Sequence, residues 1–197
     1  MPVVGVLALQ GDFEAHAGVL SELGAQPRAV RTAADLDGIH ALVIPGGEST
    51  TISLGIEREG LAEPLRDLVA SGRPVLGTCA GMIVLDRDHL GVLDASSRRN
   101  AFGRQTHSFE LDLPLREFGD QPLRAVFIRA PWVERHSDEV EVLAEVEGHP
   151  VAVRQDNVLA VAFHPELTGD RRLHEWLVQR ASAHNGAASP SAGGAEE

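Results

Sequence analysis

The chain has 197 residues, of which 43% are hydrophobic and 23% charged, a composition typical of one soluble globular domain. It carries 17 Lys and Arg against 29 Asp and Glu, and the resulting net charge of −12 at pH 7 argues against binding to nucleic acid or to an anionic membrane surface. The single cysteine, Cys79, favours a reducing, cytoplasmic compartment, and no apolar run reaches the roughly 18 residues that a membrane span needs. We therefore expect a small molecule or another protein as the partner.

The first half of the chain alternates continuous apolar runs with helical patterns, which predicts a parallel sheet buried on both faces. The expected strands are residues 3–9, 29–31, 41–44 and 74–77. The first helix should start at the N-cap Asp12 and end at Gly24. Its buried face should carry Phe13, Ala17, Leu20 and Leu23. Residues 48–50 can cap a second helix, and further helical patterns cover 61–70 and 82–85.

The second half contains mainly strand-like runs, and we expect these to add antiparallel strands to the sheet. The runs are residues 108–113, 124–128, 140–146, 150–154 and 158–163. A last helix over about 170–183 should bury Leu173, Trp176 and Leu177. Residues 184–197 have no large apolar side chain, which predicts a disordered tail behind a single domain of residues 1–183.

Cys79 lies in the sequence Gly77-Thr78-Cys79-Ala80-Gly81, directly after a strand and before a helical pattern. This is the form of a nucleophile elbow, in which a sharp turn presents the central side chain to an open site. Glycines two positions away on each side avoid clashes where the backbone doubles back. A helix N-terminus behind the sulfur favours the reactive thiolate. A buried structural cysteine is the alternative, and the flanking glycines argue against it.

A thiol nucleophile needs a base, and the segment Phe163-His164-Pro165-Glu166 offers one at the end of a predicted strand. In an extended chain the side chains of His164 and Glu166 point to the same side. A carboxylate beside the imidazole would set its tautomer and stabilise the imidazolium, as the third member of a triad does. The alternative is a surface histidine followed by a solvated glutamate.

A third element, Pro45-Gly46-Gly47-Glu48-Ser49-Thr50-Thr51, follows the strand at residues 41–44. Glycines there allow backbone N–H groups to approach an anion or a developing oxyanion. A phosphate-binding loop is excluded because no Gly-Lys-Ser/Thr follows, and an ordinary turn remains the alternative. We expect no metal site, since the sequence has no H-E-x-x-H motif and no Cys/His cluster. The remaining histidines are then surface or packing residues: His16, His40, His89, His107, His136, His149, His174 and His184.

Together these three elements resemble the class I, or triad, glutamine amidotransferases, and most specifically the glutaminase subunits of pyridoxal 5′-phosphate synthase. The resemblance is carried by GVLALQG (5–11), PGGESTT (45–51), GTCAGM (77–82), RNAFGRQ (99–105) with SFE (108–110), FIRAP (127–131) and FHPEL (163–167). Residues 86–98 look shorter than in that family. The resemblance implies an α/β fold of the flavodoxin-like three-layer type, with a mixed, mostly parallel central sheet between helices.

The resemblance also implies a function, the hydrolysis of L-glutamine to L-glutamate and ammonia without a cofactor. Cys79 would be the nucleophile, His164 the acid and base, and Glu166 the residue that orients His164. The oxyanion hole would consist of the backbone N–H groups of Gly47 and Ala80. The implied glutamine contacts are Gly47, Glu48, Ser49, Arg104, Ile128 and Arg129.

In the family that the chain resembles, the ammonia passes to a synthase subunit that builds pyridoxal 5′-phosphate. The resemblance implies docking near the turn of Gln10 and Gly11, in a complex of up to twelve subunits of each kind. Other functions stay open on sequence alone. They are a triad hydrolase serving a different synthase or substrate, a non-catalytic partner subunit, and a cysteine-based redox or deglycation protein.

Overall fold

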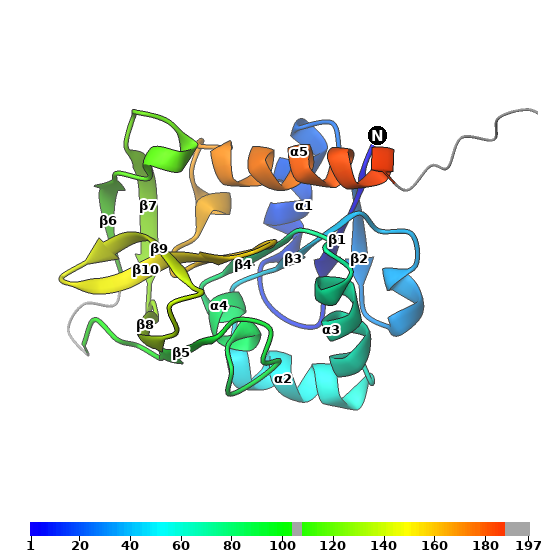
Figure 1. Ribbon diagram of the computed structural model, residues 1–197, viewed down its shortest axis with the longest axis horizontal. Coiled ribbons are helices and arrows are strands. Elements are labelled where there is room, and N and C mark those ends of the chain that lie inside the picture. Colours follow the sequence, from blue (N-terminus) through cyan, green and yellow to red (C-terminus); the bar gives the residue numbers. More distant parts are fainter. Residues whose placement is uncertain (104–107, 188–197) are drawn as a thin grey trace, which may run out of the picture.

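The computed structural model describes residues 1–103 and 108–187, and its centre is a seven-stranded sheet with the order β2-β1-β3-β4-β11-β10-β9 (Figure 1). Neighbours from β2 to β11 pair in parallel, whereas β10 is antiparallel to both β11 and β9. The strands of this sheet are β1 (Val3–Leu7), β2 (Gln26–Val30), β3 (Ala41–Ile44), β4 (Val75–Thr78), β9 (Glu141–Val146), β10 (His149–Gln155) and β11 (Val158–Val161). The predicted fold class, a mostly parallel sheet with antiparallel additions from the second half, is confirmed.

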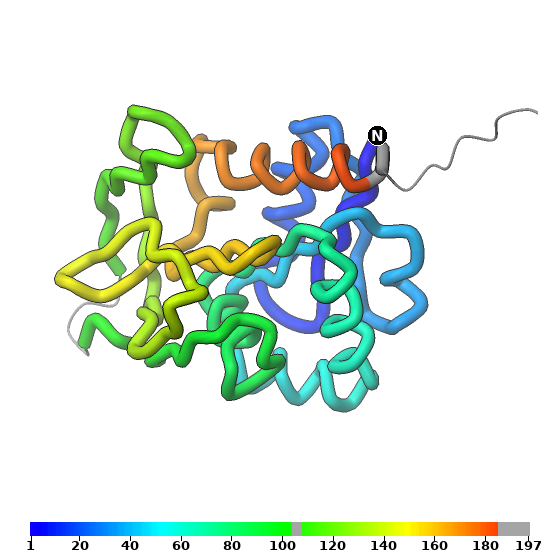
Figure 2. Tube along the Cα trace, in the orientation of Figure 1, coloured from blue at the N-terminus to red at the C-terminus, as the bar shows by residue number. Residues whose placement is uncertain are grey.

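Helices cover both faces of this sheet, which gives the three layers of an α/β domain. In Figure 1, α1 and α5 lie above the sheet, and α2, α3 and α4 lie below it. The helices are α1 (Phe13–Glu22), α2 (Ser49–Arg58), α3 (Ala62–Ala70), α4 (Ala80–Leu85) and α5 (Arg172–Ala187), with 3₁₀ turns at Ala33–Leu36, Arg116–Phe118 and Pro165–Leu167. Because α5 packs on β1, β3 and β4, its end returns to the start of the chain, as Figure 2 shows.

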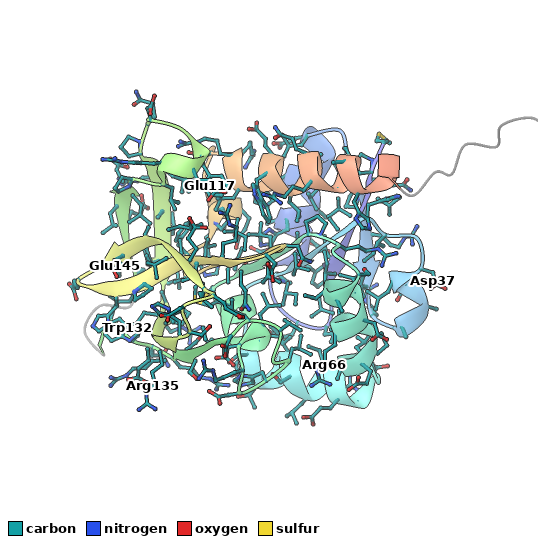
Figure 3. All side chains as sticks on the ribbon, viewed as in Figure 1. Asp37, Arg66, Glu117, Trp132, Arg135 and Glu145 are labelled. Atoms are coloured by element: carbon teal, nitrogen blue, oxygen red, sulfur yellow. The ribbon has the colours of Figure 1, made fainter. Side chains whose placement is uncertain are left out.

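Two small antiparallel sheets flank the end of the central sheet where β9 and β10 lie. One pairs β5 (Ala95–Arg98) with β8 (Trp132–His136), and the other pairs β6 (Ser108–Leu113) with β7 (Leu123–Ile128). The sequence analysis missed β5 and β8, because both are short and largely polar. In Figure 3, Glu117 lies above the β9–β10 hairpin and Trp132 below it. Glu117 pairs with Arg154 of β10, and the Trp132 ring stacks on His149 with centroids 3.7 Å apart.

Several elements begin or end away from their predicted bounds. The first strand ends at Leu7 rather than at residue 9, because Leu9 leaves the sheet to pack against Gly55 of α2. The second strand starts at Gln26 and includes Pro27, which is tolerated because β2 is an edge strand. The last helix continues to Ala187, four residues past its predicted end. The rest of the predicted tail, residues 188–197, lies outside the described residues.

The buried face of α1 also differs from the prediction. His16, Val19 and Leu20 are its buried residues, whereas Phe13 and Ala17 are only partly buried. The helix is therefore rotated toward His16, a residue whose polarity kept it out of the predicted apolar face. In α5, Leu173 and Leu177 are fully buried as predicted, Trp176 is partly buried, and His174 is fully buried beside them.

The core follows the predicted arrangement of strands buried on both sides. Every residue of β3, β4 and β11 is buried, so these strands show no alternation between apolar and polar positions.

Within the described residues, none of the helices has the length and apolar character needed to cross a bilayer.

Candidate active site

The register of the three central parallel strands brings the predicted site together. Ile44 of β3 pairs with Gly77, and Thr78 at the end of β4 pairs with Val161 of β11. The segments that follow these strands therefore leave the sheet at the same edge, where open α/β sheets form their ligand crevices. The glycine loop after β3, Cys79 and His164 all come from those segments.

Cys79 has the strained backbone that the elbow motif predicts. Its φ is 49° and its ψ is −108°, in a region that a residue with a side chain rarely adopts. Its N–H donates to the carbonyl of Val161 at 2.8 Å, which ties the turn to β11. The side chain is less open than predicted, since Cys79 is only 7% exposed beneath the surrounding loops.

The glycines on each side of the elbow are needed for close backbone contacts. A Cβ atom on Gly81 would overlap the carbonyl oxygen of Ile44, and one on Gly77 would lie 3.0 Å from the carbonyl group of Gly81. These contacts show why only glycine fits two residues before and two residues after Cys79. They also bring the start of α4 close to the end of β3.

His164 and Glu166 are in hydrogen-bond contact, as predicted, with 2.7 Å between His164 Nδ1 and Glu166 Oε1. The reason differs from the prediction, because Glu166 lies in the 3₁₀ turn Pro165–Leu167 and not in an extended chain. The backbone N–H of His164 donates to Val126 of β7 at 2.9 Å, which anchors the segment. The side chain of His164 is 12% exposed and that of Glu166 is fully buried.

The surroundings of His164 favour its protonated form. Burial lowers the pKa of His164, but hydrogen bonds with Cys79 and Glu166 outweigh burial and raise this pKa to about 10. An imidazolium between a sulfur atom and a carboxylate is the arrangement that supports a reactive thiolate.

The glycine loop after β3 packs directly on this group. A Cβ atom on Gly46 would lie 2.6 Å from Cε1 of His164, so glycine leaves room for the imidazole. Gly47 has a φ of 156°, and a Cβ atom there would overlap the side-chain oxygen of Gln10. That oxygen accepts a hydrogen bond from the N–H of Glu48 at 2.6 Å, which joins the loop to the turn after β1.

Glu48 caps α2, as the sequence analysis expected for residues 48–50. Its carboxylate accepts hydrogen bonds from the N–H groups of Thr50 at 3.1 Å and Thr51 at 2.8 Å. Hydrogen bonds from the side chain and backbone of Thr51 and from the backbone of Thr50 lower the pKa of Glu48 to about 2. Arg99 also approaches this cap, with its Nη1 atom 2.8 Å from the Thr50 hydroxyl.

A cavity of about 310 Å³ opens over Cys79 and His164. It is lined by the predicted site residues Gly47, Glu48, Ser49, Cys79, Ala80, Ile128, Arg129 and His164. Glu166 lies behind His164 and does not line the cavity. The predicted glutamine contact Arg104 lies outside the described residues.

Five further residues line the cavity without having been predicted as site residues. They are Gln10, Ile83, Arg99, Asn100 and Pro131. Four of these lie in the motifs GVLALQG, RNAFGRQ and FIRAP, which carry the family resemblance. Their place in those motifs could have marked them as site residues. Backbone strain also gathers here, because Cys79, Asn100 and Arg129 all have a positive φ.

Behind His164 and Glu166 lie two histidines that the sequence analysis placed among surface or packing residues. His16 of α1 and His174 of α5 are both fully buried. His16 Nε2 lies 3.3 Å from the second carboxylate oxygen of Glu166, and His16 Nδ1 lies 2.9 Å from His174 Nε2. The sequence offers no local signal for this contact, since the residues come from distant segments.

Among the described residues, no group of three or more His, Cys, Asp or Glu side chains is arranged to hold a metal ion.

Comparisons with known proteins identify the family of the chain. The model of the SNO glutamine amidotransferase family matches residues 6–183. Pyridoxal 5′-phosphate synthase subunit PdxT of Frankia alni is 55% identical over 186 residues, covering 90% of this chain and 94% of that protein. The subunit of the same name from Mycolicibacterium vanbaalenii is 53% identical over 193 residues, covering 92% and 98%.

Among solved structures, a glutamine amidotransferase superimposes with a TM-score of 0.86 at 47% identity, covering 91% of this chain and 98% of that chain. The resemblance noted from the sequence motifs is thereby confirmed at the level of the whole chain.

Proposed function

Because this chain belongs to the SNO glutamine amidotransferase family, we propose that it hydrolyses L-glutamine to L-glutamate and ammonia and supplies the ammonia to a pyridoxal 5′-phosphate synthase subunit. The observation that carries the proposal is that Cys79 and His164 line one cavity, with Glu166 bonded to His164 from behind. A volume of about 310 Å³ is the size of site that suits a single amino acid.

In the proposed reaction, the Cys79 thiolate attacks the side-chain amide carbon of glutamine and forms a tetrahedral intermediate. His164, held as the imidazolium, gives its proton to the amide nitrogen, so that ammonia leaves and a thioester remains. His164 then takes a proton from a water molecule, whose oxygen attacks the thioester. Collapse of this second intermediate breaks the carbon–sulfur bond, releases glutamate and restores the thiolate and imidazolium.

The negative oxygen of both intermediates would be stabilised by the backbone N–H groups of Gly47 and Ala80. Ala80 is the residue directly after the nucleophile, and Gly47 lines the same cavity. The N–H of the next loop residue, Glu48, is already bonded to Gln10. This bond ties the loop to the turn after β1, next to the position where the oxyanion develops. A preorganised donor there is worth roughly 3 kcal/mol.

Glutamine itself would be held by Gly47, Glu48, Ser49, Ile128 and Arg129, together with Arg104. The carbonyl of Ile128 lies 3.8 Å from the Cys79 sulfur, so its backbone borders the reacting group. Glu48 brings a negative charge to the cavity, and Arg129 and Arg99 bring positive charges, which suits the ammonium and carboxylate groups of a free amino acid.

The synthase partner would dock over the turn of Gln10 and Gly11, in an assembly of up to twelve subunits of each kind. Support for this surface comes from the contact between that turn and the glycine loop after β3, which carries Gly47. A Cβ atom on Gly11 would overlap the carbonyl of Gly46, so movement of the turn is transmitted to the loop. Docking there would therefore fix the loop and raise glutaminase activity.

The test is glutamate release from glutamine by the wild-type chain and Cys79→Ala, each alone and with the purified synthase subunit from the same organism. We expect release that requires Cys79 and rises when the synthase is added. Turnover that ignores the synthase would keep the chemistry and refute the partner. Failure of the wild-type chain to release glutamate while it binds the synthase would favour a non-catalytic subunit instead.

A further inference from the structure

Two buried histidines that the proposed reaction does not use contact the far side of the triad. His16 projects from α1 and His174 from α5, the two helices that cover the same face of the sheet in Figure 1. Both residues have 0% relative exposure. Burying an imidazole without a polar partner is unfavourable, so we asked which groups form hydrogen bonds with these two rings.

The contacts form a continuous path from the nucleophile to the pair. On one side His164 faces Cys79, whose interaction raises the pKa of His164, and on the other its Nδ1 lies 2.7 Å from Oε1 of Glu166. Oε2 of Glu166 is buried, and no donor in the described part of the chain meets full hydrogen-bond geometry with it. The group that faces this oxygen is Nε2 of His16, at 3.3 Å. His16 Nδ1 in turn lies 2.9 Å from His174 Nε2.

One assignment of protons places a donor opposite an acceptor at each contact of this path, while His174 Nδ1 has no partner among the described residues. Oε2 of a carboxylate is an acceptor, so His16 must carry its proton on Nε2 to face it without repulsion. His16 Nδ1 is then an acceptor, and His174 must donate from Nε2. The hydroxyl of Thr78, 3.2 Å from His16 Nε2, shares the same donor.

Both histidines are held neutral, as this assignment requires. Burial first, and then the charges of His174 and His164, lower the pKa of His16 well below its usual value. Burial, followed by the charge of Arg171, lowers the pKa of His174 to about 4. The titratable and charged groups that face the pair are Glu166, His164 and Arg171.

We propose that His16 and His174 are positioning residues for the glutaminase reaction: His16 holds the Glu166 oxygen that His164 does not use, and His174 fixes the ring of His16. The inference rests on the proposed function of the triad. A carboxylate held at both oxygens cannot turn away from His164 when the imidazolium forms. Without the His16 ring, Oε2 loses the polar group that faces it at 3.3 Å, and the buried carboxylate either rotates or takes up a proton.

The decisive pair of variants is His16→Leu and His16→Gln. Leucine has a similar size but no donor, whereas the amide N–H of glutamine reaches about as far as Nε2 of histidine. A matched control is His89→Leu, because His89 also contacts a buried carboxylate, that of Asp86, at 2.7 Å but outside the triad. All variants are made in the full chain and assayed with its synthase subunit.

With glutamine as substrate, we expect His16→Leu to lower kcat by roughly 10- to 100-fold, the effect of leaving one buried charged acceptor unsatisfied. KM should stay within about twofold, since His16 does not line the cavity. His16→Gln should restore most of kcat, and His89→Leu should keep the wild-type value. Loss of kcat by His16→Gln equal to that of His16→Leu, with both folded, would overturn the proposal.

A second readout does not depend on glutamine turnover. The rate at which iodoacetamide alkylates Cys79 follows the thiolate, and its pH midpoint reports the Cys79–His164 pair. We expect this midpoint to rise in His16→Leu and to be unchanged in His89→Leu. An unchanged midpoint in His16→Leu would overturn the proposal. If the wild-type chain released no glutamate, the proposed function would fail, but the alkylation profile would still decide the role of His16.

A third measurement covers the case in which His16→Leu does not fold. In the wild-type chain with ¹⁵N-labelled histidine, NMR distinguishes protonated from bare ring nitrogens. We expect His16 to carry its proton on Nε2 and to stay neutral. A proton on Nδ1 of His16 would leave two acceptors facing each other and would refute the proposal.

Discussion

Glu166 holds His164 through a 2.7 Å contact between Oε1 and Nδ1, across a single intervening proline. A buried carboxylate in this position stabilises the imidazolium and fixes which ring nitrogen faces Cys79. Glu166→Gln keeps the size of the side chain and removes its charge. We expect kcat for glutamine hydrolysis to fall by roughly 100-fold or more, in line with the loss of an oriented acid and base.

The control for that variant is Glu63→Gln, which removes one carboxylate from an exposed ion pair with Arg66. Its kcat should equal that of the wild-type chain. Equal rates for Glu166→Gln and the wild type would remove Glu166 from the triad.

The pH dependence of stability should report the raised pKa of His164. This pKa is about 10 in the folded chain and about 6.5 when unfolded, so the folded chain holds the proton more tightly. The stabilisation from this group is complete below about pH 6.5 and is lost as the pH rises through about 10, so the free energy of unfolding should decline over that range.

Urea unfolding of the wild-type chain and Glu166→Gln at several pH values measures this effect. The decline should be steeper in the wild type, because Glu166→Gln removes one of the interactions that raise the pKa of His164. Parallel curves for the two chains would mean that Glu166 does not raise this pKa.

The strained backbone at Cys79 predicts an unusual order of stability. Strain at a positive φ costs of order 1–3 kcal/mol, and glycine relieves it, although glycine also loses about 0.5–1 kcal/mol through greater freedom when unfolded. We expect Cys79→Gly to be about 1 kcal/mol more stable than Cys79→Ala in urea unfolding. Both variants lack the sulfur, so the comparison reports the backbone strain together with the loss of one methyl group. A more stable Cys79→Ala would show that the turn is not strained.

The glycine after the elbow should be far less tolerant of alanine than a glycine on the surface of a helix. A Cβ atom on Gly81 would overlap the backbone of Ile44, and neither side can move without displacing β3 or α4. Gly81→Ala should therefore lower the free energy of unfolding by roughly 2 kcal/mol or more. Gly18→Ala in α1 meets nothing within 4 Å and should raise it by about 0.5–1 kcal/mol. Thermal unfolding of both variants checks the prediction, and equal effects would contradict it.

The motifs of this chain could be predicted from sequence because their geometry is local. The turn at Cys79 depends on glycines two residues away, and the contact between His164 and Glu166 spans one proline. The strands β3, β4 and β11 could also be predicted, since strands buried on both faces leave continuous apolar runs in the sequence.

The tertiary structure decided which of these local pieces meet and what lies behind them. The pairing of Thr78 with Val161 brings Cys79 to His164 across more than eighty residues of chain, and no local pattern encodes that register. His16 was missed for the same reason. Nothing in the local sequence indicates that this polar helix residue is buried, because its partners Glu166 and His174 come from distant segments. Local backbone chemistry thus specified the reactive groups, whereas packing between distant segments determined how they are held.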